Sequence, residues 1–314
     1  MLRRLLHLIP AKGNSRRQDP GPSEPPVPAA SGDTPEPSEP ALAWPPGHFY
    51  SPIPDLGAIA GARNRVFASA APSLPGIDLN DAGQVALFER LCTHYNPDYF
   101  PERPASHRRY HFDNDNFRHG EALILASMLR HLRPKRLIEV GSGYSSCVTL
   151  DTRDGLGSAL KCTFVEPYPD LLHSLLREGD HAEITIVPKP VQDVETELFM
   201  ELEANDILFI DSTHVCKTDS DVNHHLFRIL PALKSGVYIH FHDIFFPFEY
   251  PAEWVFQGRA WNELYAIRAF LQYNNAFAIA FFNSYFAQAH AERFSEGMPL
   301  ATQSPGSSFW LRKV

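Results

Sequence analysis

A glycine turn flanked by two acids is the first feature of the sequence that could do chemistry. Glu139 stands one residue before the end of the apolar run "RLIEV", Gly141 and Gly143 follow this run, and Glu166 ends the next apolar run, 25 residues after Gly141. Glycines let a chain turn tightly against a ligand and aim a helix N-terminus at it. Acids beside such a turn favour a ligand with positive charge, and an acid at the position of Glu166 suits the two hydroxyls of a ribose.

A second polar cluster follows the later apolar runs. Asp211 ends "DILFID", His214 stands three residues further on, and His242 and Asp243 end "GVYIHFHD". Because the carboxyl ends of parallel strands meet at one rim of a sheet, we expect these side chains to converge beside the glycine turn. Such a cluster can hold a divalent ion that lowers the pKa of a hydroxyl. Alternatively, His214 or Lys217 can act as a base and remove the proton of that hydroxyl.

Alternating strand and helix patterns must position both clusters. Continuous apolar runs separated by helical patterns are typical of a parallel sheet covered on both faces. We expect no helix between the last two strands, which predicts an antiparallel hairpin at the sheet edge. The predicted fold class is therefore α/β, with a doubly wound, seven-stranded, mostly parallel sheet. The expected strands are 136–140, 161–166, 183–187, 206–211, 236–243, 276–282 and 308–314, and the expected helices are 80–95, 117–132, 145–153, 168–177, 192–203, 219–233 and 261–273.

The composition divides the chain into three parts. Residues 20–46 contain ten of the 28 prolines. Such a segment cannot bury enough surface to offset the entropy of ordering, so we expect residues 1–46 to be a disordered tail. Residues 47–116 are rich in aromatic side chains and are predicted to form a cap on the substrate side. Residues 117–314 hold the alternating pattern and are predicted to form the main domain.

Charge and hydropathy exclude several classes of protein. A net charge of −9 without a basic stripe argues against a nucleic-acid binder. No stretch approaches the roughly 20 apolar residues of a membrane span. The four cysteines show no metal or redox spacing and no secretory signal precedes them, so we expect a cytoplasmic protein with reduced thiols. A small-molecule or glycan acceptor fits this composition, and a homo-oligomer stays open.

The motif "EVGSGYSS" (139–146), together with Glu166, resembles the first motif and the ribose acid of the class I S-adenosylmethionine-dependent methyltransferases. The resemblance covers residues 117–314, including a seven-strand order that ends in an antiparallel pair. It implies S-adenosyl-L-methionine as cofactor, and it makes "VQDV" (191–194) the adenine contact. The implied cofactor-binding residues are Glu139, Gly141, Gly143, Ser145, Ser146, Glu166 and either Gln192 or Asp193.

An acid after the fourth strand and adjacent ligand residues after the fifth resemble the metal-dependent O-methyltransferases, including catechol O-methyltransferase and the macrolide-sugar enzymes. By position, this resemblance implies Asp211, His242 and Asp243 as ligands of Mg²⁺ or Mn²⁺ and His214 as general base. His242 stands where those families have an acid. A histidine at this position suits a softer ion better than Mg²⁺. Without a metal, His242 would orient a loop and Asp243 would cap the following segment. His240 should share a face with His242, and burial within the layer is its simpler role.

The segments over the strand ends should select the acceptor. Residues 108–117 and 245–263 mix flat apolar faces with amide and hydroxyl groups, as a sugar or another polyol requires. The stretch 206–251 also resembles a bacterial group of methyltransferases that occurs with glycan and natural-product biosynthesis, which implies such an acceptor. The candidate contacts are Tyr110, Asn114, Asn116, Tyr250 and Trp254, whereas Phe112, Phe245 and Phe246 are expected to pack the cap onto the sheet.

Several functions stay open from the sequence. The first is O-methylation of a carbohydrate or natural-product hydroxyl, with or without a metal. The second is metal-independent methyl transfer to nitrogen or oxygen, with His214 or Lys217 as base. A nicotinamide-dependent dehydrogenase would share the sheet but needs a third glycine-like position, which Ser146 meets only in part. A non-catalytic cofactor-binding scaffold is the last, and the polar cluster at 211–243 disfavours it.

Overall fold

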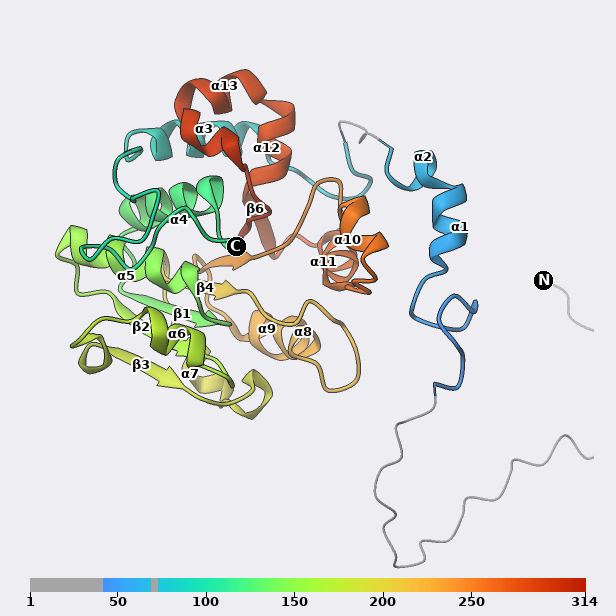
Figure 1. The fold of residues 1–314 in the computed structure, drawn as a ribbon, viewed down its shortest axis with the longest axis horizontal. Helices are drawn as coiled ribbons and strands as arrows, with labels where there is room; N and C mark the ends of the chain where they lie inside the picture. The colour runs from blue at the N-terminus through green and yellow to red at the C-terminus, as the bar shows by residue number, and fades with distance from the viewer. Residues whose placement is uncertain (1–41, 69–72) are drawn as a thin grey trace, which may run out of the picture. The chain divides into compact units, whose positions relative to one another are not determined.

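Seven strands form a single sheet in the computed structural model, which describes residues 42–68 and 73–314 (Figure 1). They are β1 (Arg136–Val140), β2 (Lys161–Val165), β3 (Ile184–Val187), β4 (Ile207–Ile210), β5 (Tyr238–Phe241), β6 (Phe277–Phe282) and β7 (Phe309–Lys313). Their order is β3-β2-β1-β4-β5-β7-β6. The first five strands are parallel, and β7 runs antiparallel to both β5 and β6. The predicted α/β fold with a doubly wound, mostly parallel sheet is therefore confirmed.

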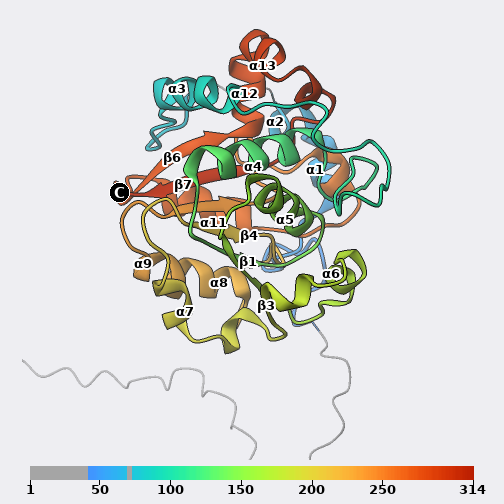
Figure 2. The same cartoon turned by 90° about the vertical axis from the view of Figure 1, so that its left-hand side faces the viewer.

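Helices cover both faces of this sheet (Figures 1 and 2). They are α1 (Leu56–Gly61), α2 (Arg63–Val66), α3 (Asp81–Cys92), α4 (His119–Leu132), α5 (Tyr144–Leu156), α6 (Asp170–Leu175), α7 (Thr196–Met200), α8 (Asp221–His224), α9 (Leu230–Ala232), α10 (Ala252–Phe256), α11 (Glu263–Leu271), α12 (Asn283–Ala289) and α13 (Ala291–Gly297). Short turns of other helix types are η1 (Asp180–Ala182), η2 (Val191–Asp193), η3 (His225–Ile229) and η4 (Pro299–Gln303). The helix expected over 219–233 is thus three consecutive segments, and that expected over 192–203 is η2 followed by α7.

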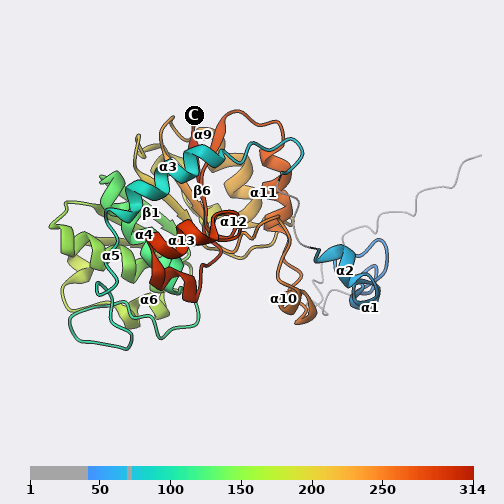
Figure 3. The same cartoon turned by 90° about the horizontal axis from the view of Figure 1, so that it is seen from above.

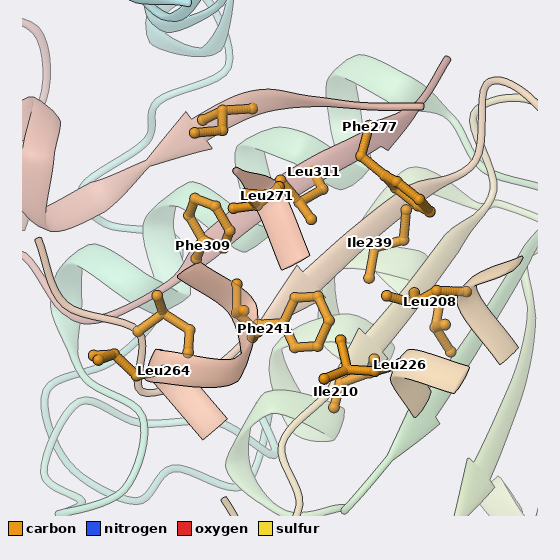
Figure 4. Packing of buried hydrophobic residues seen from close by; sticks show 14 of the residues in the cluster. Leu208, Ile210, Leu226, Ile239, Phe241, Leu264, Leu271, Phe277, Phe309 and Leu311 are labelled. Atoms are coloured by element: carbon orange, nitrogen blue, oxygen red, sulfur yellow. The ribbon is translucent and has the colours of Figure 1, made fainter. Parts of the chain in front are cut away.

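The core consists of two layers, one on each face of the sheet. Along β4, Leu208 and Ile210 belong to the layer that contains Leu226, whereas Ile207 and Phe209 belong to the layer beneath α4 and α5. This alternation is the period of two of a strand, and every residue of β4 is buried because both faces are covered. Figure 4 shows part of the first layer. Since each such side chain contributes about 1.5 to 3 kcal/mol on burial, the layers fix the ends of β4 and β5 firmly.

The connection from β6 to β7 differs from the prediction. The two strands are an antiparallel pair, but α12, α13 and η4 lie between them instead of a tight hairpin. The overlooked signal is the helical spacing of Phe286 and Phe294, which are buried against Phe88 of α3. Figures 1 and 3 show α12 and α13 beside α3. Burial of these aromatic rings stabilises helices in a connection where no helix was expected.

The end of the predicted cap is tied to the main domain by a buried arginine. Arg109 Nη1 lies 2.8 Å from a carboxylate oxygen of Asp151 and 2.8 Å from one of Asp154, and its guanidinium also pairs with Asp180. A buried guanidinium needs such partners to offset its desolvation. The division at residue 116 stays a prediction, and residues 1–41 of the predicted tail lie outside the described residues. Within the described part of the chain, every helix is too short or too polar to cross a membrane.

Candidate active site

The glycine turn brings the ends of β1, β2 and β4 together. Gly141 has a φ of +83°, and a Cβ at this position would stand 1.6 Å from the carbonyl oxygen of Asp211. The Gly141 amide donates to Val165 O at 3.0 Å, and the Asp211 amide donates to Val140 O at 2.8 Å. Only glycine combines this backbone angle with so close an approach. The motif therefore builds the rim on which both predicted clusters lie.

Some polar atoms of the turn bond within the turn itself, whereas Glu139 Oε2 and Ser142 Oγ are buried without a hydrogen-bond partner among the described residues. Ser146 Oγ accepts a hydrogen bond from the Gly143 amide at 3.1 Å at the start of α5, and the Ser145 hydroxyl donates to Glu139. Glu139 is fully buried. Burial raises its pKa to about 8, although hydrogen bonds from Ser145 and Ser146 oppose that shift. The structure thus places Glu139 beneath the turn and largely uncharged near neutral pH, so the argument from its negative charge is not supported.

A cavity of about 460 Å³ lies over the ends of β1, β2 and β4. Glu166 lines it, and its carboxylate accepts hydrogen bonds from the amides of Ser142 at 3.2 Å and Tyr168 at 2.9 Å. Gln192 also lines it, with its amide donating to Asp219 O at 2.7 Å, whereas Asp193 is exposed and does not. The remaining wall comes from Val140, Gly141, Val165, Pro167, Tyr168, Pro190, Val191, Asp211, Ser212, Thr213, Lys217, Asp219, Ser220 and Asp221.

A larger cavity of about 1130 Å³ lies on the other side of the β4 end. Its wall combines the second polar cluster with residues of four other segments, two of which contribute aromatic or basic side chains. Asp211, Ser212 and Thr213 line both cavities. The complete wall is Asp115, Asn116, Arg118, Glu121, Asp211, Ser212, Thr213, His214, His242, Asp243, Phe245, Trp254, Arg259, Trp261, Ser284, Ala287, Gln288 and Ser304 to Ser307. Two ligands bound in these cavities would therefore meet at the end of β4.

His214 is held at the wall of the larger cavity by a buried carboxylate. Its Nδ1 lies 2.8 Å from Glu263 Oε2, and its Nε2 lies 3.4 Å from Asp211 Oδ1 and 3.5 Å from Asp243 Oδ2. The carbonyl of His214 also accepts hydrogen bonds from the amides of Asn262 and Glu263 at the start of α11. Burial alone would lower the pKa of His214, but hydrogen bonds to Asp211 and Glu263 raise it to about 10. The imidazole is therefore protonated near neutral pH.

His242 is held in the same way on the opposite side. Its Nε2 lies 2.9 Å from Glu121 Oε1, and its Nδ1 lies 3.4 Å from both Asp211 Oδ1 and Asp243 Oδ1. The Ser307 hydroxyl donates to Asp243 at 2.9 Å and to Glu121 at 3.1 Å. Although burial opposes it, the charges of Asp211, Asp243 and Glu121 raise the pKa of His242 well above its ordinary value. The cluster is thus four carboxylates around two imidazoles.

The sequence of this rim matches a known family. Residues 138–244 match the family model of a methyltransferase domain. A protein of Archaeoglobus fulgidus, described as uncharacterized, is 32% identical over 168 residues, which cover 52% of this chain and 75% of that protein. The chain belongs to the class I S-adenosylmethionine-dependent methyltransferases. The strand order and the glycine turn at the end of β1 agree with this membership.

Solved methyltransferase structures show weaker likeness to this chain. The S-adenosylhomocysteine-bound methyltransferase PaMTH1 of Podospora anserina has a TM-score of 0.42 at 12% identity, covering 82% of this chain and 94% of that one. The O-methyltransferase TomG of Streptomyces achromogenes, in complex with S-adenosylmethionine, has a TM-score of 0.38 at 12% identity, covering 82% and 96%. At these scores the likeness says nothing about the acceptor of this methyltransferase.

The predicted base and the predicted metal ligands lie together in the methyltransferase. Asp211, His214, His242 and Asp243 converge on the larger cavity, whereas Lys217 lines the smaller one. Within residues 42–68 and 73–314, however, no group of three or more His, Cys, Asp or Glu side chains takes an arrangement that could hold a metal ion. The imidazole nitrogens contact the acids directly instead. The metal assignment stays a prediction.

His240 does not join His242 in a two-histidine site. Its ring stacks on Phe209 with centroids 3.8 Å apart and meets the edge of Trp310, whereas the ring of His242 is 6.2 Å away. Burial holds the pKa of His240 well below its ordinary value, so the ring is neutral. It is buried within the layer, as expected, and neither ring nitrogen has a hydrogen-bond partner among the described residues.

Two of the five predicted acceptor contacts reach the larger cavity, namely Asn116 and Trp254. Tyr110 is buried and its hydroxyl donates to Phe117 O at 2.6 Å, and Tyr250 is buried with its hydroxyl accepting from the Leu264 amide at 3.3 Å. Asn114 bonds the backbone of its own loop, accepting from the Phe117 amide at 2.8 Å. These three side chains hold the loops that shape the cavity instead of lining it.

Sequence reasoning missed three residues that hold the cluster in place. Glu121 comes from the start of α4, Glu263 from the start of α11, and Ser307 from the segment before β7. Both glutamates are buried on helices whose buried residues are mostly apolar. An acid at a core position of an amphipathic helix was the available signal, because burial of a carboxylate demands a partner. Ser307 carried no comparable signal.

Proposed function

We propose that this methyltransferase transfers the methyl group of S-adenosylmethionine to a hydroxyl of a carbohydrate or natural-product intermediate. The observation that carries the proposal is that Asp211, Ser212 and Thr213 line both cavities. The donor cavity then holds the cofactor, the larger acceptor cavity holds the hydroxyl compound, and transfer takes place at the end of β4. Holding two reactants in the reactive geometry lowers the activation barrier by about 7 to 11 kcal/mol in favourable cases.

The residues of the donor cavity fit the cofactor. Glu166 presents a carboxylate beside the glycine turn, where it would accept hydrogen bonds from the ribose hydroxyls. Gly141 lines this cavity with backbone, and Gln192 is the candidate adenine contact. When bound, the cofactor supplies a methyl group on a positively charged sulfonium.

His214 is the proposed base. Its Nδ1 is fixed on Glu263, which leaves Nε2 directed toward the cavity wall and able to take the proton of an acceptor hydroxyl. As the hydroxyl oxygen forms its bond to the methyl carbon, the carbon–sulfur bond breaks and the proton moves to Nε2. Because the pKa of His214 is about 10, only a small fraction of the imidazole is neutral near pH 7. The reaction should therefore speed up as the pH rises.

The wall of the acceptor cavity favours a polyol. Asn116 offers an amide, Gln288 offers a second one, and Trp254 and Trp261 offer flat apolar faces. Sugar rings combine hydroxyls with apolar C–H faces, so such a mixture suits them. The cavity volume of about 1130 Å³ exceeds the upper end of the range for small-molecule sites, roughly 300 to 1,000 Å³. The proposed acceptor is accordingly a glycoside or a similarly large hydroxyl compound.

A metal-assisted form of the same reaction is the second candidate. His242 Nδ1 is buried without a hydrogen-bond partner among the described residues and faces two carboxylates. If their side chains moved from the present arrangement, which does not form a metal site, Asp211, His242 and Asp243 would hold a divalent cation that lowers the pKa of the acceptor hydroxyl, with Glu121 orienting His242 from behind. Metal analysis of the purified protein and assays with EDTA decide between the forms. Loss of turnover in EDTA, restored by Mg²⁺ or Mn²⁺, would favour the metal, whereas unchanged turnover would reject it.

Methyl transfer itself is tested with labelled S-adenosylmethionine and a panel of hydroxyl compounds comprising free sugars, sugar phosphates, glycosides and phenols. We expect label in at least one sugar-containing acceptor and none in amine controls of the same size. Transfer to amines alone would replace O-methylation by N-methylation. Tight cofactor binding without transfer to any member of the panel would favour the non-catalytic scaffold.

A further inference from the structure

We propose that the acceptor carries an anionic group, a phosphate or a carboxylate, and that Arg259 binds it at the wall of the acceptor cavity. The proposal rests on the proposed function, because it concerns the acceptor of the same site. It adds a charge requirement to an acceptor so far described only as a hydroxyl compound.

Two tryptophans fix the position of the Arg259 side chain. Its Cζ lies 4.2 Å from the ring centroid of Trp254 and 5.0 Å from that of Trp261. The two rings meet edge to face at 84° and 5.5 Å, so they form a corner that holds the guanidinium. The Arg259 amide also donates to Trp254 O at 3.2 Å, which fixes the turn after α10. A guanidinium stacked on aromatic faces keeps its N–H donors available at its edge.

Arg259 differs from the other arginines near the site in having no acidic partner. Arg118, the other arginine on this wall, is paired with Asp115, and the buried Arg109 is paired with three aspartates. Arg259 forms no ion pair with any carboxylate of residues 42–68 and 73–314. Arg259 is exposed, and two indole rings, instead of a carboxylate, hold its guanidinium at the cavity wall. Its edge suits the oxygens of a phosphate or carboxylate, which a guanidinium can bind with two parallel hydrogen bonds.

Charge along the cavity wall determines the orientation of such an acceptor. Four carboxylates, of Glu121, Asp211, Asp243 and Glu263, face the two imidazoles of His214 and His242 at the transfer point, and this excess of acids would disfavour an anionic group placed there. The ring of Trp261 contacts both ends of this arrangement, since its centroid is 4.5 Å from the ring of His214 and 5.0 Å from Arg259 Cζ. The neutral hydroxyl therefore lies at His214 and the anionic group beyond Trp261, at Arg259.

Calorimetric titration tests the proposal without a known acceptor. The protein is first saturated with S-adenosylhomocysteine and then titrated with glucose 6-phosphate, glucuronate and glucose. We expect at least one anionic probe to bind about tenfold or more tightly than glucose, because hydrogen bonds to charged groups are about twice as strong as neutral ones. The phosphate and carboxylate arms distinguish the two sources of negative charge.

Three variants assign the binding to Arg259. Arg259→Ala should remove the preference for the anion, and Arg259→Lys should retain part of it, since lysine keeps the charge but loses the fork and the stacking. Arg228→Ala is the matched control, because Arg228 is an exposed arginine outside both cavity walls. Equal affinity for glucose and for both anions, or a preference that survives in Arg259→Ala, would overturn the proposal. Failure of S-adenosylhomocysteine to bind in the first step would count against the proposed function instead.

Discussion

The donor cavity and the acceptor cavity meet at Asp211 but are built in different ways. The closest contacts of the donor cavity are made by backbone, with Gly141 pressed against the Asp211 carbonyl and the Ser142 amide bound to Glu166. The acceptor cavity instead depends on ion-paired side chains from separate segments, such as Glu121 on His242 and Glu263 on His214. Substitutions should therefore act on the first cavity through steric fit, and on the second through charge and proton transfer.

Gly141→Ala should have the largest effect on cofactor affinity. The new methyl group would collide with the Asp211 carbonyl at a backbone angle that alanine rarely adopts. Overpacking costs about 1 to 3 kcal/mol even among side chains, and a comparable cost to the binding geometry of the turn should lower cofactor affinity by roughly 10- to 100-fold. Gly157→Ala is the control, because Gly157 also has a positive φ, +55°, but has no atom near the new Cβ. Equal effects of both changes on S-adenosylhomocysteine binding, measured by calorimetry, would show that the close approach does not matter.

His214→Ala should lower turnover strongly and leave cofactor affinity within a few-fold. General bases contribute about 10² to 10⁴-fold in rate, and His214 lines the acceptor cavity but not the donor cavity. Lys217→Ala is the matched control, since Lys217 is the rival base and lines the donor cavity. The measurement is label transfer to the acceptor found in the panel. A larger loss in Lys217→Ala than in His214→Ala would assign the base to the lysine.

The pH dependence of turnover should follow the protonation of His214. Its pKa is raised to about 10 by its acidic neighbours, so the neutral imidazole grows by about tenfold per pH unit below that value. We expect kcat/KM to rise from pH 7 toward pH 10 and then to level off. A cation bound to the cluster would keep the imidazoles neutral and remove this rise. A flat profile across this range in EDTA-treated protein would contradict His214 as the base.

Tyr110→Phe should have the smallest effect, confined to stability. The change removes a buried hydrogen bond to Phe117 O, but the Asn114 amide still donates to that carbonyl at 3.1 Å. We expect the free energy of unfolding to fall by about 1 kcal/mol in denaturant titrations, with the KM of the acceptor unchanged. Unchanged stability together with a higher KM would place Tyr110 in contact with the acceptor after all.

The difference between the backbone-built donor cavity and the acceptor cavity built from distant side chains also explains which parts of the molecule could be predicted. The strands around the glycine turn follow from local patterns, because continuous apolar runs bounded by Gly141, Glu166 and Asp211 are visible along the chain. The partners of His214 and His242 lie 49 and 121 residues away in sequence, and no local pattern joins them. Tyr110 illustrates the remaining difficulty, since an aromatic hydroxyl can line a cavity or bond a buried carbonyl, and only the tertiary structure decides.

The division of the site between the two cavities is tested most directly by calorimetric titration of S-adenosylhomocysteine into the wild-type protein, Glu166→Ala and His214→Ala. We predict micromolar binding to the wild type and nearly unchanged binding to His214→Ala. Binding to Glu166→Ala should be weaker by roughly tenfold or more, since it loses hydrogen bonds between a charged carboxylate and the ribose. Unchanged affinity in Glu166→Ala, or loss of binding in a folded His214→Ala, would contradict the account.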